Sequence, residues 1–382
     1  MSIEGEITVT QHCGDQRVQD VTLASTRPLV AVRVLLGRSA ADAAALVPRL
    51  YALCGHAQGA ACAAALQAAA GGGAEVPVTD ARIVMLEALQ ETLFRLLVDA
   101  PRALSLPPQA AALAPARATV HGAITALKAH PEQPQPVLKQ AAETLAALAR
   151  QHVYGGDPAD WLVANDAAAA FDRWRDTTNT LPARALARLA TTAPGLCRSD
   201  TALMPGLDDA AWWSEVVPAL QRDPLFAQAP TWGGRPVETG ALARQRAQPL
   251  VAALIARDGQ GAATRLAARL VEWATVSCAL PAAAADASDW VRAWPLGQGI
   301  GLAAVQTARG LLLHQAWLAD GRISDYRIVA PTEWNFHPQG ALFRGIVGME
   351  AGDPAALVAR TGLAVQALDP CVGFRIEIDR HA

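Results

Sequence analysis

The spacing of hydrophobic residues changes along this 382-residue chain, and this change restricts the fold more than any other feature. Near the N-terminus, apolar and polar residues alternate as in β-strands over Glu6–Thr10 and Val18–Leu23. The tail alternates in the same way over 372–379. Between residues 80 and 99 the apolar residues instead share one face of a helix: Ile83, Leu86, Leu89, Leu93, Leu96 and Leu97. We expect an α+β fold that is mainly helical, with small β elements near the N-terminus and in the C-terminal third.

Composition also favours helix, because apolar residues make up 52% of the chain and much of the excess is alanine. Ser39 is a good N-cap for a helix over Ala40–Leu46, and Gly71 ends an alanine-rich helix over Ala57–Ala70. Residues 193–240 are expected to be mostly irregular, and 281–288 to be a linker. Further helices are predicted at 137–152, 159–175, 182–191, 241–258, 261–280 and 355–368.

The remaining β elements complete the predicted organisation. Ala31–Leu36 continues the β reading of residues 5–35. Leu311–Leu318 and Arg322–Val329 flank Asp320-Gly321, a pair that favours a type I′ hairpin turn. We expect one domain over 1–382. It comprises an N-terminal β/α segment (1–75), a mostly helical middle (76–298), and a C-terminal hairpin, helix and tail (299–382).

Charge and cysteine spacing exclude several classes of function. The net charge of −3 gives no basic footprint for nucleic acid. The six cysteines form no C-x-x-C pair, which argues against a zinc ribbon, and their wide spacing is typical of reduced cytosolic thiols. The N-terminus shows no secretion signal, and no apolar run is long enough for a membrane span. We therefore expect a cytoplasmic protein.

Five segments, in order, resemble the large subunit of NiFe hydrogenases. The resemblance implies that family's helical core over roughly residues 1–75 and 230–382, and each motif is weak alone. Arg49–Cys54 is similar to R-I-C-G-V-C, and the last segment is similar to the start of D-P-C-x-x-C-x-x-H. The five segments are Arg49–Cys54, Gly234–Arg244, Ala308–Gly310 with His314, Pro331–Asn335 and Asp369–Cys371.

The departures from that family concern the metal ligands. Its four thiolates, in two C-x-x-C motifs, hold nickel and an iron that carries carbonyl and cyanide. Here Tyr51 and Phe374 stand at two of the four positions, and Cys54 and Cys371 remain. Nickel would lose half of its soft ligands. The resemblance therefore implies a pair of metal-binding cysteines, Cys54 and Cys371, with no nickel.

Other replacements remove groups that the family's chemistry uses. Val32 stands where the family has its proton-relay glutamate, Glu377 where it has the terminal histidine, and Gln58 where a histidine follows the first motif. Without the glutamate, proton transfer lacks its acid–base group. We expect a protein without hydrogenase activity, in which Glu377 points to solvent.

What is retained is the family's cage around the diatomic ligands of iron. Arg309, Pro331 and Thr332 stand in the places of the arginine and the P-T pair. A guanidinium and a hydroxyl or backbone N–H supply the hydrogen bonds that cyanide nitrogens need away from water. The resemblance thus implies a transient Fe(CN)2(CO) cargo.

This combination resembles the HupK/HoxV group of hydrogenase accessory proteins. The implied role is a scaffold or carrier that receives Fe(CN)2(CO) from maturation factors of the HypC and HypD type and passes it to the apo large subunit. One difficulty is that Cys54 is of the family's bridging type whereas Cys371 is of its nickel-only type. His56 is a candidate extra ligand that would complete the coordination.

Plainer alternatives stay open. In the first alternative, Cys54 and Cys371 are inert buried thiols, and Arg309 is an ion-pair residue. The chain is then a metal-free structural or docking subunit. A third alternative is a residual redox or hydrogen-sensing enzyme. Trp334 and Asn335 are expected to be structural, as are Cys13, Cys62, Cys197 and Cys278; the tryptophans at 212, 213, 232, 273, 290, 294 and 317 are expected in the core.

Overall fold

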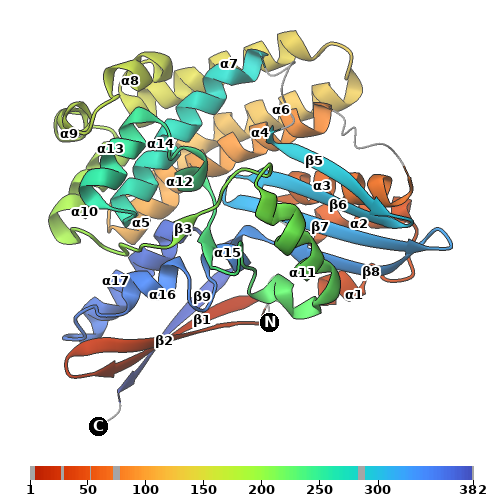
Figure 1. Cartoon of the computed structure of the whole chain (residues 1–382). Helices are drawn as coiled ribbons and strands as arrows, with labels where there is room; N and C mark the ends of the chain where they lie inside the picture. Colours follow the sequence, from red (N-terminus) through yellow and green to blue (C-terminus); the bar gives the residue numbers. More distant parts are fainter. Residues whose placement is uncertain (1–4, 27–29, 52, 72–77, 283–288, 381–382) are drawn as a thin grey trace.

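Alanine and glycine let helix α3 (Gly55–Ala69) lie directly against one face of a four-stranded antiparallel sheet (Figure 1). Most of its side chains are small and buried. At the contact, a Cβ on Gly301 would lie 2.1 Å from the carbonyl oxygen of Ala65 and 2.3 Å from the nitrogen of Ala69. Only glycine permits this approach. It fixes Cys54, the N-cap residue of α3, next to the apolar cluster that contains Leu312 and Ala330.

The computed structural model describes residues 5–26, 30–51, 53–71, 78–282 and 289–380. The four-stranded sheet has the order β5-β6-β7-β8, formed by Val291–Gly297, Ile300–Thr307, Gly310–Ala319 and Arg322–Val329. Asp320 and Gly321 both have positive φ (51° and 73°), as a type I′ turn requires, so the predicted hairpin is confirmed.

A second sheet joins the two ends of the chain. β1 (Glu6–Gly14) pairs antiparallel with β2 (Arg17–Ser25) and parallel with β9 (Gly373–Arg380). Phe374, Ile376 and Ile378 pack against the main core, and Glu377 is exposed, as the alternation predicted. This pairing fixes the chain that follows Cys371. A short parallel pair, β3 (Ala202–Leu203) and β4 (Val237–Glu238), forms a separate two-stranded sheet.

The helices lie around the sheets, and α4, α6, α7, α13 and α14 pack together in one layer (Figure 1). Their bounds, in chain order from α1 to α17 without α3, are Val30–Arg33, Ala40–Leu50, Val78–Phe94, Ala100–Ala103, Leu113–Ala129, Pro134–Ala149, Pro158–Ala164, Ala168–Thr177, Leu181–Thr192, Val217–Arg222, Ala241–Arg244, Pro249–Asp258, Ala262–Ala279, Pro331–Asn335, Ala341–Ile346 and Pro354–Leu368. Single π-helical turns occur at Arg95–Asp99, Arg150–Tyr154 and Trp212–Val216. Among the described residues, no helix is both long and apolar enough to cross a membrane.

Most predicted elements are present, with four differences. The helix predicted over 159–175 is two helices, α8 and α9, separated at residues 165–167. Val30–Arg33 is a helical turn rather than strand, so the β reading of that segment was wrong. Helix α6 (Leu113–Ala129) was not predicted. Its Pro115 lies in the first turn, where proline is tolerated because its missing N–H has no partner anyway. Pro249 divides the predicted helix 241–258 into α12 and α13.

The segment 193–240 also contains more structure than predicted, including α11 and both short strands. Trp212, Trp232 and Trp273 are in the core as expected, whereas Trp213 is 44% exposed, so its assignment to the core was wrong. The linker predicted over 281–288 lies mostly outside the described residues.

Candidate functional site

A buried charge cluster fixes the tail just before Cys371. Helix α17 ends at Asp369, which adopts a left-handed conformation (φ 58°). Its carboxylate lies 2.5 Å from Arg95 Nη2, 3.3 Å from Arg309 Nε and 3.8 Å from Arg269 Nη2. Burial alone would raise the pKa of Asp369, but the three arginines outweigh it and lower that pKa. The carboxylate therefore stays charged and holds Cys371 in place.

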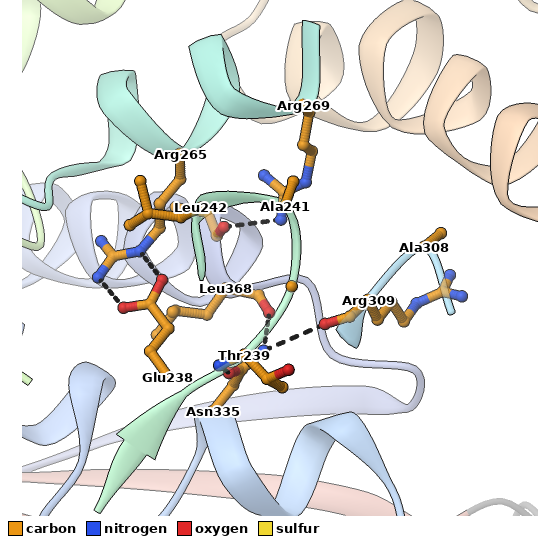
Figure 2. Close-up of a pocket in the computed structure, with 12 residues that line it drawn as sticks. Glu238, Thr239, Ala241, Leu242, Arg265, Arg269, Ala308, Arg309, Asn335 and Leu368 are labelled. Atoms are coloured by element: carbon orange, nitrogen blue, oxygen red, sulfur yellow. Dashed lines mark hydrogen bonds and ion pairs between the residues drawn. The ribbon is translucent and has the colours of Figure 1, made fainter. Parts of the chain in front are cut away.

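Arg309 lies in the turn between β6 and β7, and the backbone there has almost no room. Gly310 has φ +132°, and a Cβ on it would lie 2.3 Å from Thr239 Cγ2. Asn335 ties this turn to its neighbours: its Oδ1 accepts from Thr239 N (2.9 Å), and its Nδ2 donates to the carbonyls of Arg309 (3.4 Å) and Leu368 (3.5 Å). In Figure 2 the guanidinium of Arg309 points away from these anchors.

Residues of the second segment of resemblance, Gly234–Arg244, support the turn between β6 and β7. Glu238 forms a doubly hydrogen-bonded ion pair with Arg265, at 2.7 Å for each contact, and both side chains are 3% exposed (Figure 2). Arg244 pairs with Glu272 (2.5 and 2.8 Å) and donates to the carbonyl of Thr307 (3.0 Å). The resemblance in this segment is therefore carried by residues that support Arg309.

Cys371 lies against the first turn of helix α15. Pro331 occupies the N1 position of that helix, where its fixed φ suits the helix start. The adjacent Thr332 places its Oγ1 3.0 Å from Cys371 Sγ and accepts from the Cys371 backbone N–H at 3.4 Å. Thr332 is 4% exposed and Cys371 is 7% exposed. The structure thus brings Cys371, Pro331 and Thr332 together.

Arg309 connects this half of the site to Cys54. Its Nη2 lies 3.2 Å from a Glu91 carboxylate oxygen on α4, and among the described residues its Nη1 has no hydrogen-bond partner. Burial lowers the pKa of Arg309, but the negative charges of Asp369, Glu91, Cys371 and Cys54 raise it further than burial lowers it. Cys371, Pro331 and Thr332 lie together, and Arg309 pairs with Asp369, two residues before Cys371. Cys54 packs against the apolar cluster that contains Ala330, the residue before Pro331.

His56 lies on another side of Cys54. It lines a cavity of about 330 Å³ with Tyr51, Glu91 and His121, bounded by the residues on both sides of Cys54. Burial and the nearby charge of Lys128 lower the pKa of His56. The backbone N–H groups of His56 and Ala57 donate to Glu87, each at 2.9 Å, and burial raises the pKa of Glu87 to about 7. Cys54 itself is partly exposed, and its neighbours Leu53 and Gly55 line the cavity.

The other cysteines lie elsewhere. No disulfide joins any of the six cysteines, all of which lie within the described residues; Cys13, Cys62 and Cys197 are buried and Cys278 is exposed. Within the described part of the chain, no group of three or more histidine, cysteine, aspartate or glutamate side chains is placed to hold a metal ion.

Sequence reasoning missed the ion pair between Arg309 and Glu91. Glu91 lies on the helix predicted at 80–99, where Glu87, Glu91 and Arg95 recur every four positions and share one face. Glu87 and Arg95 are at most 9% exposed. A charged stripe on a helix with a wide apolar face was the available signal. Arg95 also lies in a π-helical turn, a feature frequent at functional sites.

The pKa of His314 gives a test of the structure around Cys54. Complete burial lowers this pKa from 6.5 to about 3. Between those values the unfolded chain binds the proton and the folded chain does not, so stability falls as the pH drops below about 6.5. From about pH 6.5 to about pH 5 the expected loss is about 2 kcal/mol.

Urea unfolding at both pH values measures this loss. His314→Gln should lose about 2 kcal/mol less than the unaltered protein over that interval. His130→Gln, at a histidine whose side chain is 69% exposed, is the matched control and should leave the interval unchanged. Equal losses in the unaltered protein and His314→Gln would contradict a neutral, buried imidazole.

Solved structures with similar folds place the chain in a structural class. A NiFeSe hydrogenase from Dm. baculatum matches 94% of this chain and 94% of its own, with a TM-score of 0.58 and 17% identity. A variant of the NiFeSe hydrogenase from Desulfovibrio vulgaris Hildenborough matches 97% of this chain and 99% of its own, with a TM-score of 0.59 and 16% identity. The model of the family "Nickel-dependent hydrogenase" matches residues 247–373. The fold is that of a hydrogenase large subunit.

Curated relatives define the family more narrowly. Hydrogenase expression/formation protein HoxV of Cupriavidus necator is 32% identical over 93% of this chain and 92% of its own length. Hydrogenase expression/formation protein HupK of Azotobacter vinelandii is 32% identical over 98% of both chains. The chain belongs to this HupK/HoxV family of hydrogenase expression/formation proteins. The similarity includes the middle of the chain, where the motif comparison found only helical character.

Proposed function

We propose that this protein acts in hydrogenase maturation as a non-catalytic scaffold that transiently holds an Fe(CN)2(CO) fragment. The proposed ligands of the iron are Cys54 and Cys371, and Arg309, Pro331 and Thr332 surround its cyanide and carbonyl ligands. The fragment comes from maturation factors of the HypC and HypD type and goes to the apo large subunit. No nickel is involved.

One observation carries this proposal: a hydroxyl touches the sulfur of Cys371 beside a buried guanidinium. Thr332 Oγ1 lies 3.0 Å from Cys371 Sγ, and Arg309, which is 4% exposed, lies 3.3 Å from Asp369, two residues before Cys371. Cys54 packs against the cluster that contains Ala330, the residue before Pro331. Thiolates are soft ligands that suit iron bearing cyanide and carbonyl. Arg309 Nη1 and the Thr332 hydroxyl are the donors available to cyanide nitrogens.

The two-thiolate site suits transfer rather than permanent binding. Release is a ligand substitution in which the Fe–S bonds to Cys54 and Cys371 break and Fe–S bonds to the acceptor form. Each cysteine sulfur then takes up a proton, which balances the proton that an acceptor thiol loses on binding iron, and the oxidation state of iron does not change. The proposed route in and out is the cavity beside Cys54, because Cys54 is partly exposed and Cys371 is buried. His56 lines that route and is a candidate ligand during passage.

A second candidate is a metal-free docking subunit with the same fold. The observation that favours it is the charge cluster itself: Arg309 already pairs with Glu91 (3.2 Å) and Asp369 (3.3 Å). The site is therefore held together by its own residues, and the tail needs no metal to stay in place.

Complementation separates the two candidates. Cells that lack this protein receive the unaltered chain, Cys54→Ser, Cys371→Ser or, as a control, Cys278→Ser, and hydrogenase activity is measured. A scaffold that uses both thiols requires Cys54 and Cys371, so both variants should fail while Cys278→Ser complements fully. Full complementation by Cys54→Ser and Cys371→Ser, with normal protein levels, would establish the docking alternative.

A further inference from the structure

A chain of buried polar groups extends from Cys54 into the contact between α3 and the four-stranded sheet. The Nε2 of Gln58 donates to Cys54 Sγ at 3.8 Å. The Oε1 of the same carboxamide lies 2.9 Å from His314 Nε2 on β7, and His314 Nδ1 lies 2.7 Å from the hydroxyl of Tyr326 on β8. Tyr326 in turn contacts Cys62 on α3. The chain thus starts and ends on one helix and crosses two strands.

Burial leaves these groups little freedom. Gln58, His314, Tyr326 and Cys62 are each at most 1% exposed. A buried polar atom without a partner is costly, so reversing any one group is unfavourable unless all of them reverse together. The rings of His314 and Tyr326 meet edge to face, with centroids 5.5 Å apart, which also fixes the imidazole plane.

The chain has a direction. An amide oxygen only accepts, so His314 Nε2 carries the proton when Gln58 turns its NH2 toward Cys54. Burial keeps the imidazole neutral, so Nδ1 has a lone pair and accepts the Tyr326 O–H. Tyr326 donates to His314, His314 donates to Gln58, and Gln58 donates to the sulfur of Cys54.

We propose that His314 and Tyr326 are positioning residues that hold the Gln58 carboxamide with its N–H directed at Cys54 Sγ. An N–H donor stabilises negative charge on a sulfur, and the thiolate is the form that binds metal and attacks electrophiles. The use of this thiolate for iron rests on the proposed function above. The series of hydrogen bonds from Tyr326 to Cys54 does not depend on that function, so it can be tested on metal-free protein.

The test measures alkylation of Cys54 by iodoacetamide near neutral pH, resolved by mass spectrometry, with the exposed Cys278 as internal reference. A donor worth about 1.4 kcal/mol to the thiolate raises its population tenfold. A less basic thiolate is also a weaker nucleophile, which offsets part of this gain. Loss of the donor should therefore slow the alkylation of Cys54 about threefold. Gln58→Met removes the donor, and His314→Met removes the group that orients it; methionine fills similar volume without a polar atom.

Non-additivity distinguishes positioning from packing. Because His314 acts through Gln58, the double variant should also react about threefold slower, whereas independent effects would multiply to about ninefold. Tyr326→Phe, which keeps the ring in place, should slow Cys54 in the same direction and serves if His314→Met does not fold.

Three outcomes would overturn the proposal. The first is an unchanged or faster Cys54 in His314→Met or Tyr326→Phe, as a chain of reversed direction would give. The second is a double variant in which the two effects on the alkylation rate of Cys54 multiply. The third is an equal slowing of the alkylation of Cys278. Since no metal is present, a failure here leaves the scaffold proposal to its own experiment.

Discussion

Asp369→Asn should destabilise the protein by about 3–5 kcal/mol, because it leaves buried arginines without their shared counter-ion. The carboxylate is 3% exposed and lies within 3.8 Å of Arg95, Arg309 and Arg269. Asparagine keeps the shape and tolerates the left-handed conformation, so the expected loss is electrostatic. Urea unfolding near neutral pH measures it.

A matched control lies at the other end of the same helix. Asp353 is the N-cap of α17 and accepts from the Ala356 N–H at 2.9 Å. Asparagine caps a helix about as well as aspartate, so Asp353→Asn should change stability by less than about 0.5 kcal/mol. Equal effects of the two substitutions would show that the charge cluster does not hold the tail.

Gly301→Ala should cost about 3 kcal/mol or more, because the new Cβ meets backbone atoms rather than a flexible side chain. The nearest atoms are Ala65 O at 2.1 Å and Ala69 N at 2.3 Å, so α3 must move off β6. Cys54, at the start of α3, would move with it. Unfolding by urea, together with the alkylation rate of Cys54, measures both effects.

Gly122→Ala is the corresponding control in helix α6, where an added Cβ has no atom within 4 Å. Alanine is favoured over glycine in a helix by about 1 kcal/mol, so this variant should be more stable than the unaltered protein. A mild effect of Gly301→Ala, comparable in size to that of Gly122→Ala, would contradict the direct contact between α3 and the sheet.

Local patterns predicted the elements whose cause is local. Ser39 caps α2 with its hydroxyl on the Asp42 N–H (3.1 Å), and Asp320-Gly321 makes the turn that their φ preferences favour. The alternation in the tail predicted β9, but not its parallel pairing with β1, which joins residues 367 positions apart. No local signal specifies such a partner.

The same distinction between local patterns and contacts distant in sequence applies to the candidate site. The motifs predicted Cys54, Cys371, Arg309 and Thr332, because family resemblance transfers residue by residue. Nothing in the motifs predicted that Glu91 would pair with Arg309, since 218 residues separate them. The link from Gln58 to His314 spans 256 residues and depends on the close packing of α3 on the sheet. Asn335, expected to be merely structural, connects three segments around Arg309.

The charge cluster gives the proposed cargo a specific environment. Arg309 is paired with two carboxylates, and the cyanide nitrogens of the proposed cargo would compete with Glu91 for the same guanidinium. Such competition would limit how tightly the proposed cargo binds, as the proposed carrier role requires. Glu91 also lines the cavity beside Cys54, so it has room to move when the cargo arrives.

The most direct test of the scaffold proposal is an iron and infrared measurement on protein purified without oxygen from cells that contain the maturation factors. We expect bound iron with carbonyl and cyanide stretching bands and no nickel. Cys54→Ser and Cys371→Ser should each lose both the iron and the bands, while Cys278→Ser keeps them. Protein that carries neither iron nor bands, or bands that persist when both Cys54 and Cys371 are replaced, would contradict the account.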